Sequence, residues 1–470
     1  MRYILTILSA AWLAIGSAAP GKEAAPQVNY SEHIASIIYN KCTPCHRSGE
    51  AAPFTLVNYT EVKKRGRVIA DVTRARTMPP WKADHGDYEF KSERRLTDAE
   101  IDLIQRWVAD GMPEGNPALA PALPKFTEGW QLGKPDLIVK MPEAYSVPAG
   151  GPDIYRNFAI PLNLPEDKWV RAVDFRPGTR AVVHHSLFFL DTTGDARKKD
   201  AADPEPGYSG GMGGGVNVLA LLGARGRNDG KSASLSLGGW AVGAQAKQLP
   251  DGLAFFVPKG ADLILSTHFH PSGKPEKEMS TLGLYFSDKA PEQAFAGIQL
   301  PPLFGVFKGI DIPAGAKEYV IEDSFVIPVD VKAFGVGAHA HYLAKTMKMT
   351  ATLPDGNTKT LLSIGDWDFA WQDQYQFKNF VFLPKGTKLK VHITYDNSAE
   401  NPHNPSSPPK RVKWGEGSFD EMGSMSLQVV TAKPEEMSAL RQEVMSHVRQ
   451  AFGERGRMFP FPGSTPPNGR

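Results

Sequence analysis

Cysteine is almost absent from this chain: its 470 residues include only Cys42 and Cys45. Both lie in one five-residue segment, so none remains for the disulfides that small exported domains often use. A blue-copper site is also excluded, because such a site needs a thiolate beside its histidines. The sequence therefore excludes the multicopper oxidases and the cupredoxins.

An excess of one charge and long apolar runs are also missing. Lys and Arg number 53 and Asp and Glu number 51, which gives a formal net charge of +2. This balance is unlike the basic footprint of a nucleic-acid-binding protein. Beyond the N-terminus, no stretch approaches the ~20 apolar residues of a membrane-spanning helix. We expect no nucleic acid partner and no stable membrane insertion once the leader is removed.

The N-terminus has the pattern of a secretory signal peptide. Arg2 precedes the apolar run Tyr3–Ile15, and small residues follow up to Ala19. The run is too short to span a bilayer comfortably, which favours a cleaved signal over a membrane anchor. We predict a signal peptide over residues 1–19 and a periplasmic or secreted protein.

The sequence pattern of the remaining chain changes once, from helical to strand-like. Helical patterns come first, including a capping-box sequence from Thr97 to Glu100. Short alternating apolar runs, separated by Gly, Pro, Asn and Asp, follow and are typical of antiparallel β-sandwiches. The predicted fold is multidomain: a small all-α domain (28–115), a Pro- and Ala-rich linker (116–134), two jelly-roll-like β-sandwiches (135–300 and 301–433), and a terminal helix with a disordered tail (434–470).

The segment from Cys42 to His46 is a C-x-x-C-H motif. Its two thiols can form thioether bonds to haem, and the adjacent His46 then lies under the iron. A thioredoxin-like redox pair would need a βαβ context, which the sequence lacks. Met78 is the candidate sixth ligand, because a thioether on a Pro-flanked loop suits the Met/His ligation of cytochromes c; His85 is the fallback. Residues 28–115 resemble a class I cytochrome c domain, with one covalent haem c.

Six of the twelve histidines fall into three close pairs. Residues i and i+2 of a strand share a face, so each H-x-H pair can meet one ion. Adjacent histidines point to opposite faces and can share an ion only at a bulge or strand end. A single pair is more often structural, but three pairs together indicate metal. The pairs are His184-His185, His268-x-His270 and His339-x-His341.

Imidazole ligands suit copper or zinc. A one-electron carrier on the same chain favours copper, since zinc has no redox chemistry. Copper(I) also accepts a thioether ligand. We therefore expect copper at these histidines, with a methionine among its ligands.

The order His-His, H-x-H-P, H-x-H and Glu-Met resembles the copper type II, ascorbate-dependent monooxygenases, the family of peptidylglycine α-hydroxylating monooxygenase and dopamine β-hydroxylase. The resemblance spans about residues 135–432. It implies two coppers, one that passes electrons on and one that binds oxygen and hydroxylates a substrate C–H bond. It places the electron-transfer copper in the first sandwich and the oxygen-binding copper in the second. The implied ligands are His184, His185 and His268 for the first copper, and His339, His341 and Met422 for the second.

The chain also departs from that family. Its copper region has no disulfides, and Gly337, Ser424 and Ser426 stand where the peptide-hydroxylating relatives anchor their substrate. A peptide or catecholamine substrate is therefore not supported. Two ligand questions stay open: His270 is either a ligand or a hydrogen-bonding neighbour, which we favour, and Met425 competes with Met422.

Two functions follow from these expectations. The first is an exported copper monooxygenase acting on a small organic substrate and O2. Its electrons would come from its own haem, which is supplied by a donor protein or a small reductant. The second is a non-hydroxylating periplasmic electron-transfer or copper-binding protein. We favour the first, because a histidine and methionine set suits oxygen chemistry better than a structural site.

Overall fold

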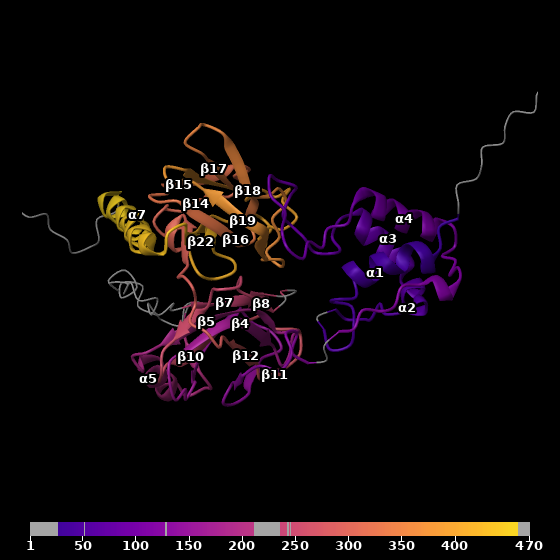
Figure 1. Cartoon of the computed structure of the whole chain (residues 1–470), viewed down its shortest axis with the longest axis horizontal. Coiled ribbons are helices and arrows are strands. Elements are labelled where there is room, and N and C mark those ends of the chain that lie inside the picture. The colour runs from indigo at the N-terminus through magenta and orange to yellow at the C-terminus, as the bar shows by residue number, and fades with distance from the viewer. Residues whose placement is uncertain are drawn as a thin grey trace, which may run out of the picture.

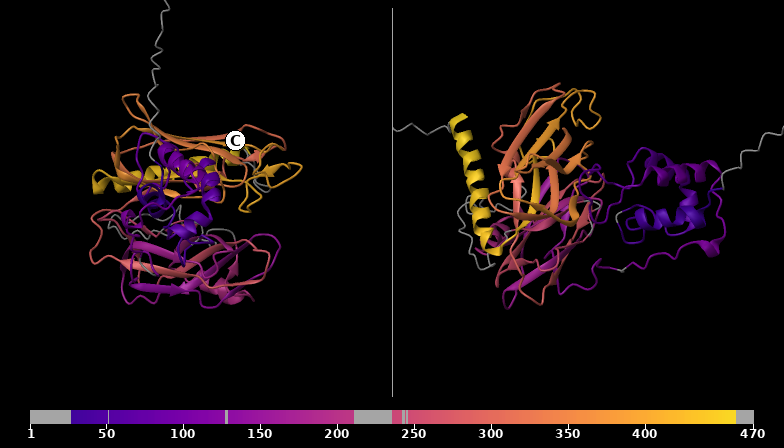
Figure 2. Two further views of the ribbon diagram at one scale, coloured as in Figure 1. Left: turned by 90° about the vertical axis from the view of Figure 1, so that its right-hand side faces the viewer. Right: turned by 45° about the horizontal axis from the view of Figure 1, so that its top comes forward.

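The computed structural model describes residues 27–50, 52–126, 129–210, 236–241, 244 and 246–458. The predicted signal peptide and the predicted tail beyond residue 458 lie outside the described residues. Most of the described chain forms antiparallel β-sheets, preceded by a helical region and followed by one long helix. The helical region and the final helix lie on opposite sides of the sheets (Figures 1 and 2).

The helices of the N-terminal region share one hydrophobic cluster, in which Ile34, Ile104 and Trp107 are fully buried. The capping box at Thr97 and Glu100 is present and begins α4. Two of these helices, Tyr59–Lys64 and Gly66–Arg74, meet at Arg65, whose backbone is not helical. The helices are η1 (π-helix, Tyr30–Ile34), α1 (Ala35–Lys41), α2 (Tyr59–Lys64), α3 (Gly66–Arg74), α4 (Asp98–Ala109) and the 3-10 helix η2 (Pro117–Leu119).

The first pair of sheets follows. One has the strand order β1-β12-β4-β8, with β9 also on β4, and the other has the order β6-β3-β10-β5-β7. Their inner side chains form one core that includes Phe158, Phe188 and Leu263. The elements are β1 (Leu137–Lys140), β2 (Tyr145–Val147), β3 (Ile154–Pro161), β4 (Lys168–Arg176), β5 (Val183–Asp191), α5 (Asp195–Ala202), β6 (Tyr208–Ser209), β7 (Ser236–Ala241), β8 (Lys247–Gln248), β9 (Phe255–Val257), β10 (Asp262–Phe269), β11 (Glu276–Glu278, paired with β2) and β12 (Thr281–Phe286).

The second pair of sheets has the orders β13-β22-β16-β19 and β15-β20-β17-β18 around a separate core. The division expected near residue 300 falls at the end of β13, whose partner β22 belongs to this second pair. Met437 and Leu440 of the final helix α7 pack into the same core. The elements are β13 (Ala296–Leu300), η3 (Pro302–Gly305), β14 (Asp311–Ile312), β15 (Tyr319–Val326), β16 (Val331–Ala340), β17 (Ala344–Thr352), β18 (Thr358–Ile364), β19 (Gln374–Leu383), β20 (Lys388–Tyr395), β21 (Val412–Lys413, paired with β14), β22 (Gly423–Thr431), η4 (Pro434–Glu436) and α7 (Met437–Met458).

A segment of the helical region, residues 80–91, packs on the second pair of sheets; we call it the arm. Phe90 forms a β-bridge with Phe377 of β19, and the Lys91 N–H donates to the Gln376 carbonyl at 2.8 Å. The ring of Trp81 meets Tyr375 edge-on, with centroids 5.1 Å apart. The loop between α3 and α4 therefore contributes to the core of a distant part of the chain.

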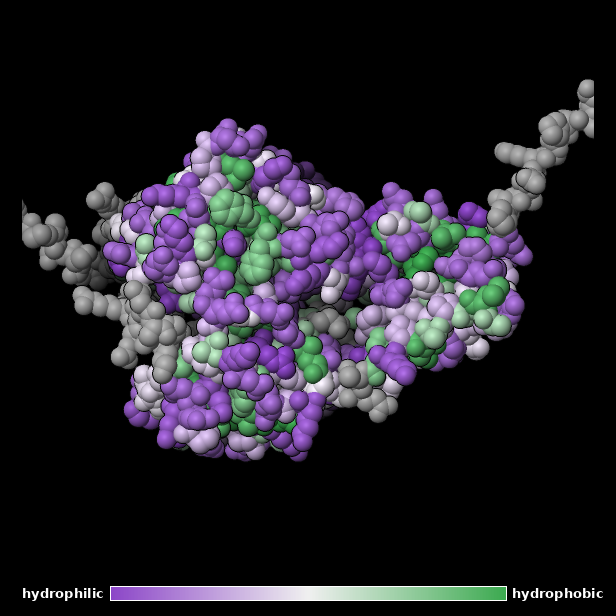
Figure 3. Space-filling model, in the orientation of Figure 1, coloured by the Kyte–Doolittle hydropathy of each residue, from purple (hydrophilic) through white to green (hydrophobic). Residues whose placement is uncertain are grey.

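In the described part of the chain, every helix is too short or too polar to span a lipid bilayer. The face seen in Figure 3 is largely hydrophilic over the two pairs of sheets, with scattered apolar patches.

Candidate metal centre

Two adjacent histidines on β5 face a third on β10. In the ladder between these strands, His185 pairs with His268, and the next pair joins Val183 to Phe269. His184 is therefore the additional residue of a β-bulge, which brings both adjacent imidazoles to one side. The Nδ1 atoms of His184 and His185 lie 2.9 Å apart, and those of His185 and His268 lie 3.4 Å apart.

These three histidines could hold a metal ion, because their candidate ligand atoms all lie within 4.8 Å of one another. Burial, together with the neighbouring His268, lowers the pKa of His184 to about 3. Burial and the same neighbour hold the pKa of His185 well below its usual value. These two imidazoles are thus neutral at pH 7, which is the form that binds metal.

Asp153 orients the His268 ring. Its carboxylate accepts from His268 Nε2 at 3.0 Å and from His270 Nδ1 at 2.7 Å. Burial raises the pKa of Asp153, but the hydrogen bonds from His268, Ser418 and His270 outweigh burial and hold it well below the usual range. With Nε2 occupied, His268 offers Nδ1 to a metal. His270 is 60% exposed and reaches Asp153 rather than the cluster of ligand atoms.

The second predicted ligand set also comes together. His339 and His341 lie at the end of β16 with ring centroids 5.4 Å apart, and the Met422 sulfur lies 3.1 Å from His339 Nε2. Burial lowers the pKa of His339 to about 4 and that of His341 to about 3. The rival methionine, Met425, pairs with Ala338 in the ladder of β16 and β22 and is buried in the core.

Hydrogen bonds fix which nitrogen each of these histidines presents. His339 Nδ1 lies 2.5 Å from Gln372 Oε1, and His341 Nδ1 lies 3.1 Å from the Asp420 carbonyl. Both partners are acceptors, so each Nδ1 carries the proton and each Nε2 is left for a metal.

Glu421 joins the H-x-H segment to the methionine segment. Its buried carboxylate accepts the backbone N–H groups of His341 at 2.6 Å, Met422 at 2.9 Å and Leu343 at 2.9 Å. Burial raises the pKa of Glu421 to about 8, although these N–H groups oppose the rise. Glu421 therefore sets the relative position of two predicted ligands.

The two ligand sets are neighbours across the interface between the two pairs of sheets. The ring centroids of His185 and His339 are 6.5 Å apart. The buried ring of Phe369 lies between the sets, 4.7 Å from the His184 centroid and 5.5 Å from the His341 centroid. The structure thus gathers all six predicted copper ligands into one cluster.

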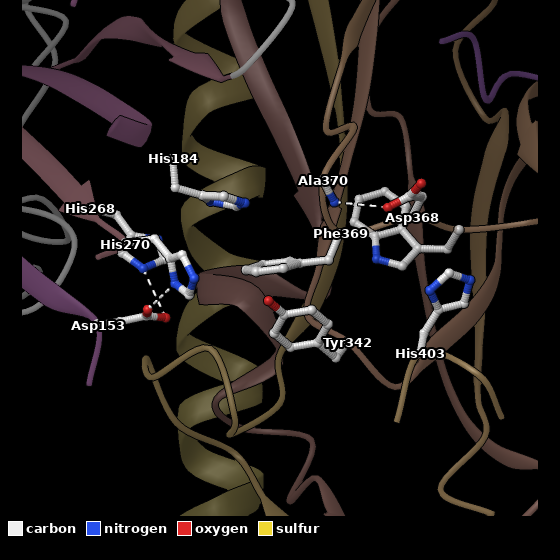
Figure 4. A pocket seen from close by; sticks show the side chains of 10 residues that line it. Asp153, His184, His268, His270, Tyr342, Asp368, Phe369, Ala370 and His403 are labelled. Carbon is white, nitrogen blue, oxygen red and sulfur yellow. Dashed lines mark hydrogen bonds and ion pairs between the residues drawn. The ribbon is translucent and has the colours of Figure 1, made fainter. Parts of the chain in front are cut away.

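A cavity of about 210 Å³ opens beside this cluster. Figure 4 shows His184 and His268 on one side of it and the rings of Phe369 and Tyr342 facing them. His403 lines the opposite end. A small molecule such as O2 has room to approach the histidines here.

The C-x-x-C-H motif follows α1 and begins a tight turn, in which the His46 N–H donates to the Cys42 carbonyl at 2.9 Å. His46 Nδ1 lies 3.1 Å from the Phe54 carbonyl, which leaves Nε2 for an iron atom. Burial raises the pKa of Cys42 to about 12, so its thiol is protonated at pH 7. The Nε2 atom of His46 suits an iron ligand.

Met78 lies four residues beyond the end of α3. It is half-buried, and its N–H donates to the Val72 carbonyl at 3.2 Å. The fallback ligand His85 is exposed on the arm. Of the two predicted candidates, Met78 is thus the more enclosed, and its role as the sixth ligand stays a prediction.

Four residues of the site were not found from the sequence. Asp153 follows a glycine-rich turn and Gln372 lies between strands, and neither has a spacing that marks it as a partner of histidine. The roles of Phe369 and Glu421 depend on their burial, and that burial is produced by segments distant in the sequence. Only the Glu-Met dipeptide gave a partial signal, for Glu421.

Comparisons with known proteins do not assign this site. No protein-family model and no curated protein sequence matches the chain. Among solved structures, the major capsid protein P2 of bacteriophage PM2 is 10% identical, with 63% of this chain and 97% of that chain covered at a TM-score of 0.25. A subviral particle protein, VP2 of infectious bursal disease virus, is 12% identical over 66% of this chain and 75% of its own, at a TM-score of 0.19. A xanthan lyase from Paenibacillus is 11% identical over 68% of this chain and 28% of its own, at a TM-score of 0.16. At these TM-scores the likeness establishes no common fold.

Proposed function

We propose that this protein is an exported copper-dependent monooxygenase that hydroxylates a C–H bond of a small organic substrate with O2. In this proposal residues 28–115 are a class I cytochrome c domain, and two jelly-roll-like sandwiches hold one copper each. The observation that carries the proposal is the meeting of the two predicted ligand sets at one buried interface, with ring centroids of His185 and His339 6.5 Å apart.

The side chains of this chain suit copper in three ways. Burial lowers the pKa values of four imidazoles and keeps them neutral, so protons do not compete with a metal for them at pH 7; the four are His184, His185, His339 and His341. Asp153 and Gln372 hold fixed tautomers of His268 and His339. The Met422 sulfur gives the second set a soft ligand suited to copper(I).

Bound copper would supply oxygen activation and one-electron transfer, and haem attached at Cys42 and Cys45 would supply electrons from a periplasmic donor or a small reductant. The protein's own contribution is to exclude water. Phe369 is buried between the two ligand sets, and Tyr342 stands beside it with ring centroids 4.4 Å apart. A reacting C–H bond would therefore meet a largely dry site.

The test is the haem and metal content of the exported protein, followed by anaerobic reduction and an oxygen pulse in the same sample. The expected result is one haem and two coppers per chain, with oxygen reoxidising the haem only when copper is present. His339→Gln should abolish the copper-dependent reoxidation. The control His392→Gln changes a half-exposed histidine of β20 beside Glu322 and should leave it intact. Zinc or no metal at the histidines, or haem reoxidation that ignores copper, would contradict the proposal.

A non-hydroxylating electron-transfer or copper-binding protein is the second candidate. It is favoured by the enclosure of the site, since His341 is 4% and Met422 6% exposed. In that case oxygen would reoxidise the reduced protein at a rate that no organic compound changes. A monooxygenase would show reoxidation coupled to its substrate.

A further inference from the structure

A second and larger cavity, of about 310 Å³, lies where the arm and the two pairs of sheets meet. We call it the junction cavity. Trp81 and Arg94 line it from the helical region, Trp240 from the first pair of sheets, and Phe334 from the second. No histidine is among the described residues that line it, so it is distinct from the cavity beside the metal centre. Binding sites for small molecules often lie at such junctions between domains.

The floor of the junction cavity is an outer face of β16. Gly335 pairs with Gln376 of β19 and with Gln428 of β22. A Cβ atom at Gly335 would lie 2.5 Å from the Gln428 side-chain oxygen, and one at Gly337 would lie 3.1 Å from Gln374 Cγ. The glycines therefore allow two glutamine side chains to lie across the strand, and the floor is covered with amides.

The described residues do not use the hydrogen-bonding capacity of these amides. In the described part of the chain, the side chains of the four glutamines that line the cavity make no hydrogen bonds. A side-chain amide offers two donors and one acceptor with two lone pairs. A ligand with hydroxyl or amide groups can satisfy both kinds. The four are Gln248, Gln374, Gln376 and Gln428.

The other walls are aromatic, and of the three cations that line the cavity only Lys91 has no ion pair among the described residues. Trp240 packs against Phe175 with ring centroids 5.3 Å apart, and the wall continues to Trp81. Asp373 pairs with Arg94 at 2.7 Å and with Lys247 at 3.8 Å. Aromatic walls over a floor of amides favour a molecule that carries both a ring and hydrogen-bonding groups.

The floor of the junction cavity also extends along β16 toward the metal centre. After the bulge at Phe334, alternate residues of β16 share a face, so Gly335, Gly337 and His339 lie in one row. A two-residue step along a strand is about 7 Å. A ligand seated over the glycines would thus lie along the strand from a predicted copper ligand.

We propose that the junction cavity binds a ring-bearing organic molecule with hydroxyl or amide groups. Its identification as the substrate rests on the proposed monooxygenase function, whereas the binding itself does not. The ring contacts Trp240 and Trp81, and the polar groups pair with the glutamine amides over Gly335.

Calorimetric titration of the full chain with 2-naphthol at pH 7, before and after copper is removed by a chelator, tests the binding. The expected result is saturable binding in both samples. Gln428→Leu removes one amide and should weaken 2-naphthol binding about tenfold. Gly335→Ala should weaken it similarly, because the new methyl group displaces Gln428.

Gly297→Ala is the matched control: it lies on β13, next to β22, where a Cβ would meet no atom within 4 Å, and it should bind like the natural chain. His403→Ala alters the other cavity and should also leave binding unchanged. The proposal would be overturned if 2-naphthol did not bind, or if the Gln428 and Gly335 variants bound it as tightly as the natural chain. A chain that binds 2-naphthol but takes up no copper would overturn the proposed function and leave this inference standing.

Discussion

His185 of the first pair of sheets and His339 of the second face each other with ring centroids 6.5 Å apart. The two ligand sets therefore share one desolvated region, and a change at one set reaches the other through a single layer of side chains. The partners that orient individual rings, however, are separate, so the contribution of each set can be measured by itself.

Removing the hydrogen-bond partner of His339 should weaken the binding of one of the two copper ions. In Gln372→Leu the Nδ1 proton of His339 loses its acceptor, and affinity should fall about 10- to 100-fold for one equivalent of copper. Competition with a chelator measures this. Gln372→Glu keeps an acceptor and should retain most of the affinity; equal loss in both variants would show that the hydrogen bond is not the cause.

Removing the hydrogen-bond partner of His268 should weaken the binding of the other copper ion. Asp153→Ala frees His268 Nε2 and should also lower affinity about 10- to 100-fold for one equivalent. His270→Ala is the control, because His270 is exposed and its ring meets the other oxygen of the Asp153 carboxylate; we expect a change within about twofold. A loss in His270→Ala as large as in Asp153→Ala would make His270 a ligand.

Glu421 should be a major source of stability for the second pair of sheets. Glu421→Ala leaves the N–H groups of His341, Leu343 and Met422 buried without this acceptor, at a cost of about 1–3 kcal/mol for each. Thermal unfolding of the metal-free chain should show a clearly lower melting temperature. Glu421→Gln keeps a side-chain oxygen and should lose less; an Ala variant as stable as the natural chain would contradict this role.

Acid should weaken the contact between Arg156 and Asp203. The hydrogen bond from Arg156, together with backbone N–H groups, lowers the pKa of Asp203 to about 2. A carboxyl whose pKa is lower in the folded state stabilises the fold above its unfolded value of about 3.9, and this contribution is lost as the pH falls toward 2. Asp203→Asn should therefore melt below the natural chain at pH 7, and the difference should shrink between pH 4 and pH 2. A difference that does not change with pH would refute the assignment.

The parts of this molecule that the sequence predicted are those set by local chemistry. The cap of α4 at Thr97 is local, and the structure has it. Alternating apolar runs predicted antiparallel strands, and strands such as β5 and β10 are present, because their alternation is encoded in each strand alone.

The parts that were missed depend on pairing between distant strands. Met422 and Met425 could not be separated by spacing, but the register puts Met425 opposite Ala338 in the core and leaves Met422 just outside the strand. Gln372 contacts a residue 33 positions away, and Asp153 contacts one more than 100 positions away. No periodicity along one segment carries that information.

The helical region is attached to the sheets at two places, the linker and the arm. Composition predicts a domain boundary at the linker 116–134. Residues 80–91 form a second attachment through Phe90 and Phe377. The chain is thus closed into a ring, joined covalently at the linker and by packing at the arm. A cut in the linker would not release two independent pieces. Tyr375 and Phe377 would stay covered until the arm is also removed. Replacing the helical region by another domain would therefore require a redesign of the surface that contacts the arm.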